Sequence, residues 1–176
     1  MNDKRTPVNV RLLAVNAMLA AMCVVLGYVA IDLGTVKITF ESLPILIAGL
    51  MFGPAWGAGV GLVGTLLSQL LKYGVSVTTP LWILPYVVCG LMAGVYAKKR
   101  GFELTQKQMI FIVVFCELLV TAFNTLALYV DSKVYGYYQI GIISTVLVLR
   151  LVICLVKALA FSYVLPILMK PIKKNL

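Results

Sequence analysis

The sequence predicts an all-α membrane protein that folds as a compact bundle of six transmembrane helices. Hydrophobic residues make up 62% of the 176 positions and charged residues only 12%, which is more apolar surface than a water-soluble core of this length needs. Long apolar runs alternate with short polar connections along the whole chain. The basic residues are also grouped in a way that gives the helices a consistent orientation.

Ten of the 15 basic residues lie in three clusters. The clusters are Lys4, Arg5 and Arg11 before the first apolar run, Lys98, Lys99, Arg100 and Lys107 in one connection, and Lys170, Lys173 and Lys174 at the end of the chain. The positive-inside rule assigns such clusters to the cytoplasm, so six spans with both termini cytoplasmic is the consistent solution. The net charge of +9 therefore indicates a lipid bilayer as partner and not a nucleic acid.

The first helix is expected at residues 11–31. Small residues recur on one of its faces at Ala14, Ala17 and Ala21, and such a stripe lets another helix pack closely. The sequence alone leaves open whether that helix belongs to a partner or to the same molecule. Alternating β-branched and polar residues from Asp32 to Glu41 predict a short extended loop before the second helix.

The second and third helices are expected at 42–52 and 55–71, separated by Gly53-Pro54. This region contains six glycines, which in a membrane act as packing spacers between helices. Both segments are short for a hydrocarbon core that takes about 20 helical residues. They are interpreted either as thin, tilted spans or as a re-entrant pair.

The remaining helices are expected at 81–97, 108–130 and 140–169. No linker or repeat divides the chain, so residues 1–176 are predicted to form a single integral membrane domain. There is no histidine, and the four cysteines all lie inside apolar runs without a CxxC pair. The sequence therefore predicts no catalytic residues, no metal site and no cofactor, and argues against an enzyme.

Ionisable residues inside a membrane span are costly, and each calls for a partner or a function. Glu117 lies roughly 15 Å from the inner end of its helix and Lys157 roughly 18 Å from the inner end of the last helix. Because the depths match, a structural ion pair between Glu117 and Lys157 is expected. A role in ligand binding, or separate partners, remains the alternative.

Arg150 has no carboxylate at its own depth, and its guanidinium fork suits an anionic ligand group. The hypothesis is an outward-opening cavity with a positive floor or rim, in which Asn124 orients the ligand. The outer loops add three lysines: Lys37, Lys72 and Lys133. Trp82 and Tyr86 are expected to supply aromatic walls, with the tyrosines between Tyr135 and Tyr138 as further candidates. The alternative for these aromatic residues is a place in the interfacial belt that many membrane proteins have.

The run KITFESLPILIAGLMFGPAWGAGVGLVGTLLSQL, together with Ala17/Ala21, GLMAGVYAKKR, FNTLAL and the arginine of the last helix, resembles a known family. These motifs are similar to the substrate-binding S components of energy-coupling factor (ECF) vitamin transporters, and most of all to the folate-specific, FolT-like group. The resemblance covers essentially the whole chain.

The resemblance implies a subunit of the bacterial cytoplasmic membrane that captures folate, an anionic pterin vitamin, from outside. It implies delivery inward by a membrane T component and two ABC-type ATPases, with Ala17, Ala21 and Ala14 behind them facing the T component. Folate would suit the predicted cavity: aromatic residues such as Trp82 would stack on it, Asn124 would recognise the pterin, and Arg150 or an outer lysine would bind the glutamate tail. The alternatives are an S component for hydroxymethylpyrimidine or a queuosine precursor, a purely structural membrane protein, and a stand-alone channel.

Overall fold

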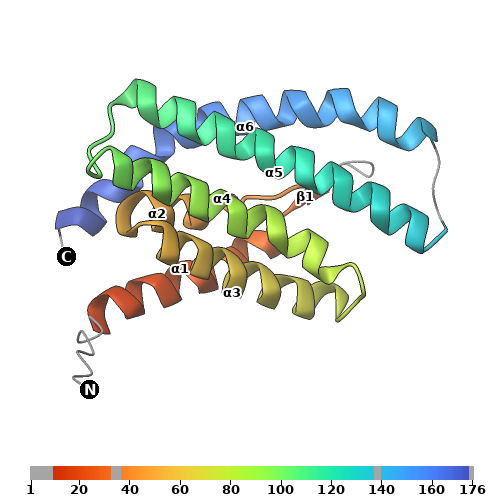
Figure 1. Cartoon of the computed structure of the whole chain (residues 1–176), viewed down its shortest axis with the longest axis horizontal. Coiled ribbons are helices and arrows are strands. Elements are labelled where there is room, and N and C mark those ends of the chain that lie inside the picture. Colours follow the sequence, from red (N-terminus) through yellow and green to blue (C-terminus); the bar gives the residue numbers. More distant parts are fainter. Residues whose placement is uncertain (1–9, 33–36, 137–139, 175–176) are drawn as a thin grey trace, which may run out of the picture.

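The computed structural model describes residues 10–32, 37–136 and 140–174, without the side chains of residues 32, 37, 140–146 and 174. Within these ranges the chain forms six helices and one two-stranded sheet, which confirms the predicted all-α architecture (Figure 1). The elements are α1 (Val10–Tyr28), β1 (Ile31–Asp32), β2 (Lys37–Ile38), α2 (Ser42–Phe52), α3 (Pro54–Tyr73), α4 (Thr79–Lys99), α5 (Gln106–Val134) and α6 (Ile140–Lys174).

Five of the described helices, all except α2, are long and apolar enough to cross a membrane. α2 has 11 residues and is therefore about 16 Å long, whereas the hydrocarbon core of a bilayer is about 30 Å thick. Of the two interpretations of the 42–71 region, neither applies to both helices: α3 has the length of a full span, and α2 covers about half of one.

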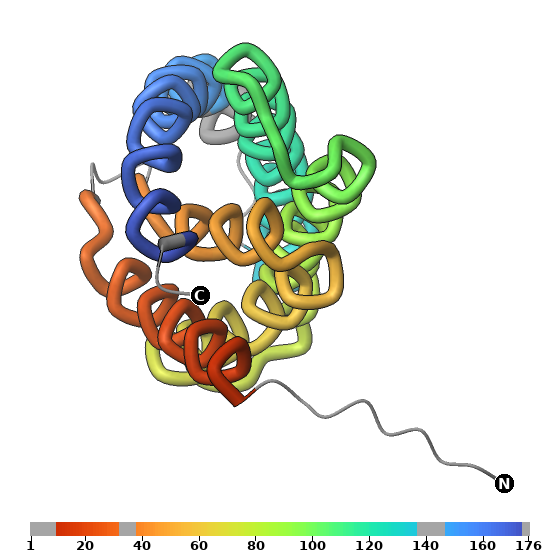
Figure 2. Tube along the Cα trace, turned by 90° about the vertical axis from the view of Figure 1, so that its left-hand side faces the viewer, coloured from red at the N-terminus to blue at the C-terminus, as the bar shows by residue number. Residues whose placement is uncertain are grey.

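The five long helices surround α2. Viewed end-on, α1, α3, α4, α5 and α6 form a ring, and α2 lies inside it at the end of the bundle where both termini lie (Figures 1 and 2). Every residue from 42 to 50 is buried, as expected for a helix that is apolar on all sides. α2 therefore fills one half of the ring.

The first helix ends earlier than predicted. α1 stops at Tyr28 and not at Ile31, because Ile31 pairs with Ile38 in the antiparallel ladder of β1 and β2. The short extended loop expected between the first two helices thus contains a two-stranded ladder. Its second strand leads directly to Glu41, which precedes the first residue of α2.

Gly53 makes the reversal between α2 and α3. Its φ of 96° lies in a region that residues with a side chain rarely adopt, and Pro54 then starts α3, where the missing backbone donor costs nothing. Gly57 lies one turn further along α3, so close to Gly49 and to the Gly90 carbonyl that no side chain fits there. The α2, α3 and α4 backbones meet at this point.

Replacement of Gly57 by leucine is therefore expected to destabilise the protein strongly. The added side chain would collide with the backbones of α2 and α4, and overpacking a tight site costs about 1–3 kcal/mol or more. Gly59 is the matched control, because a Cβ at this position on the same helix would meet nothing within 4 Å. Thermal unfolding in detergent should show a large drop for Gly57→Leu and little change for Gly59→Leu; equal behaviour would contradict the packing argument.

Candidate ligand cavity

A cavity of about 480 Å³ lies in the half of the bundle that α2 does not fill. Its lining comes from β2 and the segment between β2 and α2, from the connection between α3 and α4, and from the halves of α3, α4, α5 and α6 that lie away from the chain termini. The volume falls within the roughly 300–1,000 Å³ typical of small-molecule sites. The shortness of α2 is thus what leaves room for a ligand inside the ring of helices.

Four of the residues predicted to bind a ligand line this one cavity: Arg150, Asn124, Trp82 and Tyr86. They come from α4, α5 and α6, and only the folded bundle brings them together. The fifth, Lys37, lies in β2, and its side chain is outside the described part of the structure. Its predicted role is therefore neither supported nor contradicted.

Arg150 is only weakly held by the protein. One terminal nitrogen, Nη1, donates a long hydrogen bond of 3.4 Å to Thr125 Oγ1, and its buried Nε has no hydrogen-bond partner among the described residues. Nor does any described carboxylate lie within ion-pair distance of it. A half-buried guanidinium with unused donors can bind an anionic group of a ligand.

Asn124 and Tyr86 form a polar part of the wall. The Tyr86 hydroxyl lies 3.4 Å from Thr39 Oγ1 and also interacts with the side chain of Asn124. The buried Oδ1 of Asn124 has no partner in the described part of the chain. Because an unpaired buried acceptor is costly, this oxygen is suited to accept an N–H from a bound molecule.

Glu117 and Lys157 form an ion pair next to the cavity, and Lys157 is part of the cavity wall. Lys157 Nζ lies 2.7 Å from Glu117 Oε2, and the Glu117 side chain is fully buried while that of Lys157 is 14% exposed. The other carboxylate oxygen, Oε1, accepts a hydrogen bond of 2.5 Å from Ser42 Oγ at the start of α2. The structure therefore brings the two residues into the ion pair that their depths suggested, and it ties α5 and α6 to α2.

Removal of Lys157 is expected to destabilise the protein, because it leaves the Glu117 carboxylate buried without its counter-charge. Breaking one side of a buried pair costs about 3–5 kcal/mol. Lys157→Met should therefore lower the unfolding temperature in detergent, and the double variant Glu117→Gln/Lys157→Met should recover much of the loss. A double variant no more stable than Lys157→Met alone would contradict this.

The cavity also contains two carboxylates that the sequence did not indicate, Glu41 and Asp131, and one lysine expected in an outer loop, Lys72. The expected positive floor is therefore a wall with charges of both signs. Asp131 accepts a hydrogen bond of 2.5 Å from Thr78 Oγ1, and Lys72 donates to the carbonyl of Gly27. These residues lie near predicted helix ends, where a sequence gives no sign of whether a charge faces water or a cavity.

Glu41 is the most buried of the three, with 8% of its surface exposed. Burial raises the pKa of its carboxyl group above the ordinary value, whereas the positive charge of Lys72 and the hydroxyl groups of Tyr86 and Ser68 oppose that shift. The Ser68 hydroxyl approaches the carboxylate without meeting hydrogen-bond geometry. A carboxylate thus faces the cavity on the side opposite α5 and α6.

The small residues of α1 lie on the outside of the bundle. Ala14, Ala17 and Ala21 are all exposed, whereas Asn16, Leu19 and Ala20 are buried against the rest of the protein. Of the two interpretations of this stripe, packing within the molecule does not account for it. Its surface is available to a membrane lipid or to another protein.

The described residues offer no obvious site for a metal ion, since they contain no group of three or more His, Cys, Asp or Glu side chains placed to hold one. The four cysteines are buried and unpaired. The chemistry that the cavity does provide is binding chemistry: a cation, a carboxylate, an amide and aromatic rings around an open space.

Known proteins resemble this chain in both sequence and structure. The family model for the substrate-specific component of ECF transporters matches residues 11–169. A crystal structure of FolT bound with folic acid has a TM-score of 0.69 at 23% identity, covering 88% of this chain and 92% of that one. A structure of the S component of a bacterial ECF transporter has a TM-score of 0.64 at 21% identity, covering 94% and 96%. No curated protein sequence matches.

Proposed function

The chain belongs to the family of substrate-specific components of ECF transporters, and on that premise we propose that it captures folate in the cavity beside α2. The family is one of transporter subunits that bind substrate, and not of enzymes. The similarity to FolT shows a shared fold, so the choice of folate depends on the residues that line the cavity.

The unused hydrogen-bond donors of Arg150 are the main support for this proposal. Its buried Nε has no partner in the described part of the chain, and its only hydrogen bond is long. A neutral vitamin would leave this cation without a counter-charge, whereas folate carries two carboxylates on its glutamate tail. Binding of a carboxylate by the guanidinium fork would form charge-assisted hydrogen bonds, which are about twice as strong as neutral ones.

The other end of folate is an aromatic pterin with a hydrogen-bonding edge, and two features of the cavity suit it. Trp82 and Tyr86 offer ring surfaces for stacking, and the unpaired Oδ1 of Asn124 offers an acceptor. A site that combines an apolar surface with a few placed polar groups is the usual form of a small-molecule pocket.

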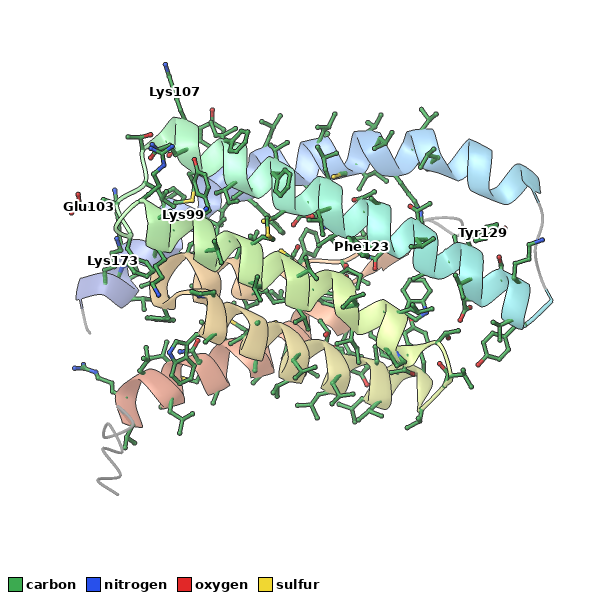
Figure 3. All side chains as sticks on the ribbon, in the orientation of Figure 1. Lys99, Glu103, Lys107, Phe123, Tyr129 and Lys173 are labelled. Carbon is green, nitrogen blue, oxygen red and sulfur yellow. The ribbon has the colours of Figure 1, made fainter. Side chains whose placement is uncertain are left out.

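We further propose that the cavity opens to the outside of the cell and that both termini are cytoplasmic. Lys99, Lys107 and Lys173 gather at the end of the bundle where the termini lie, while Tyr129 lies toward the other end (Figure 3). This agrees with the positive-inside rule. Folate would then enter at the outer end and leave with the help of a membrane T component and two ABC-type ATPases in the cell membrane.

The proposal predicts that the protein retains folate when it is purified in mild detergent. Denaturation of the sample should release a compound with the absorbance of a pterin and the mass of folate, at up to one molecule per protein. An Arg150→Gln sample prepared in parallel should release much less. The proposal would be contradicted if the sample releases a different vitamin, or if protein from cells supplied with folate releases no vitamin at all.

A further inference from the structure

Glu41 is a buried carboxylate that has no part in the binding of the folate tail by Arg150. It lies in the cavity wall, 8% exposed, directly before α2. An anionic ligand would be repelled by a negative charge at this position, unless the ligand presents a different chemical group there. The question is whether Glu41 has a structural role that accounts for its burial.

Among the described residues, Glu41 neither caps a helix nor forms an ion pair, which are the two usual structural roles of a buried acid. It occupies the N-cap position of α2 but makes no side-chain cap hydrogen bond. No Lys or Arg nitrogen of the described residues lies within 4.0 Å of its carboxylate, although Lys72 and Lys157 are near enough to attract it. The positive end of the α2 dipole also favours the ionised form. The charge is thus stabilised by lysines at a distance and by the nearby hydroxyl groups of Tyr86 and Ser68, without a direct ion pair, and its oxygens retain capacity to accept further hydrogen bonds.

A glycine in α1, which has no side chain, makes room for this carboxylate. Gly27 is buried, and a Cβ at that position would overlap Glu41 Oε1 and come within 2.9 Å of Ser68 Oγ. Tyr86 approaches the carboxylate from α4. Three helices therefore shape a niche around Glu41, and it lies on the α1–α3 side of the cavity, across from the α5–α6 side that carries Arg150.

We propose that Glu41 binds the N–H edge of the ligand's heterocycle, an amino group next to a ring N–H on a 2-amino-4-oxopyrimidine ring. This deepens the proposed function and rests on it, because the pterin of folate carries such an edge. Two adjacent N–H donors match the two oxygens of a carboxylate, as they do in an arginine–carboxylate fork. Arg150 on the opposite side would bind the tail. The negative charge of Glu41 and the positive charge of Arg150 would then fix the orientation of the ligand in the cavity.

The test is a cycle that pairs a change in the protein with a change in the ligand. Binding of folate and of an analogue whose 2-amino group is replaced by methyl is measured by isothermal titration, for the wild type and for Glu41→Gln. We expect wild-type protein to prefer folate on the order of 100-fold, since a site built to bind an N–H rejects a ligand that lacks it. Glu41→Gln should lose most of this preference.

A second variant keeps the proposal testable if Glu41→Gln folds poorly. Gly27→Ala changes none of the side chains that line the cavity, but its methyl group displaces the flexible end of Glu41. It should therefore also weaken the binding of folate and reduce the preference for folate over the analogue. Gly59→Ala is the matched control, because nothing lies within 4 Å of its added methyl group. It should bind like the wild type.

The outcomes distinguish a failure of the role proposed for Glu41 from a failure of the proposed folate function. If wild-type protein binds folate but Glu41→Gln and Gly27→Ala keep the wild-type preference over the analogue, this inference is overturned and the proposed function stands. If either variant lowers the affinity for both ligands by the same factor, the role of Glu41 is structural and the inference is also overturned. If wild-type protein does not bind folate, the proposed function fails and this inference fails with it.

Discussion

Replacement of Arg150 by glutamine is expected to lower the affinity for folate about 100-fold or more. Truncating one partner of a buried, hydrogen-bonded charge pair costs about 2–5 kcal/mol, and each 1.4 kcal/mol is a factor of ten in Kd. The fold should survive, because Arg150 makes only one long hydrogen bond to the described part of the protein. The effect should therefore appear in binding and not in the unfolding temperature.

Two further variants sharpen this prediction. Arg150→Lys keeps the charge but loses the planar fork, so it should fall between the wild type and Arg150→Gln. Arg100→Gln removes an exposed arginine from the end of the bundle that lies away from the cavity, and it should bind folate like the wild type. Isothermal titration in detergent would measure all four proteins. Unchanged affinity in Arg150→Gln would remove the main support for an anionic ligand.

Replacement of both Ala17 and Ala21 by leucine is expected to abolish folate uptake while folate binding stays intact. The two alanines are exposed on α1 and do not line the cavity. If this face packs against the T component, the added side chains would hold the two helices apart, since close approach depends on small residues. A loss of uptake of at least tenfold, with an unchanged Kd, is the predicted pattern.

The matched control places the same change on other exposed alanines. Ala122 on α5 and Ala160 on α6 are also exposed, and the double variant Ala122→Leu/Ala160→Leu should transport folate normally. Uptake would be measured in cells that also produce the T component and the two ATPases. If the α1 variant transports as well as the wild type, α1 does not supply the docking surface.

Much of the fold follows from simple features of the sequence. Apolar run length predicted the positions of the helices, and Gly53-Pro54 fixed the boundary between α2 and α3 because a glycine with positive φ and a proline at a helix start permit little else. The end of α1 was predicted too late. Ile31 is as apolar as the helix before it, and only its pairing with Ile38 removes it from the helix, a contact that hydropathy does not report.

The site was predictable where a residue is out of place in its own segment. Arg150, Lys157 and Glu117 are charges inside apolar runs, and such charges are noticeable because the membrane makes them costly. Glu41 and Asp131 gave no such signal, since each lies at a helix end, where charged residues are common. Their place in the cavity depends on the short α2, which leaves a space that only the assembled ring of helices defines.

Titration of the purified wild-type protein, freed of bound ligand, tests the central claim most directly. Calorimetry with folate, thiamine and hydroxymethylpyrimidine as separate titrants would compare an anionic pterin with a cationic and a neutral ligand. We predict saturable binding of one folate per protein with a Kd of about 1 μM or tighter, and no comparable binding of the other two. Failure to saturate with folate, or tighter binding of hydroxymethylpyrimidine, would contradict the assignment of this cavity to folate.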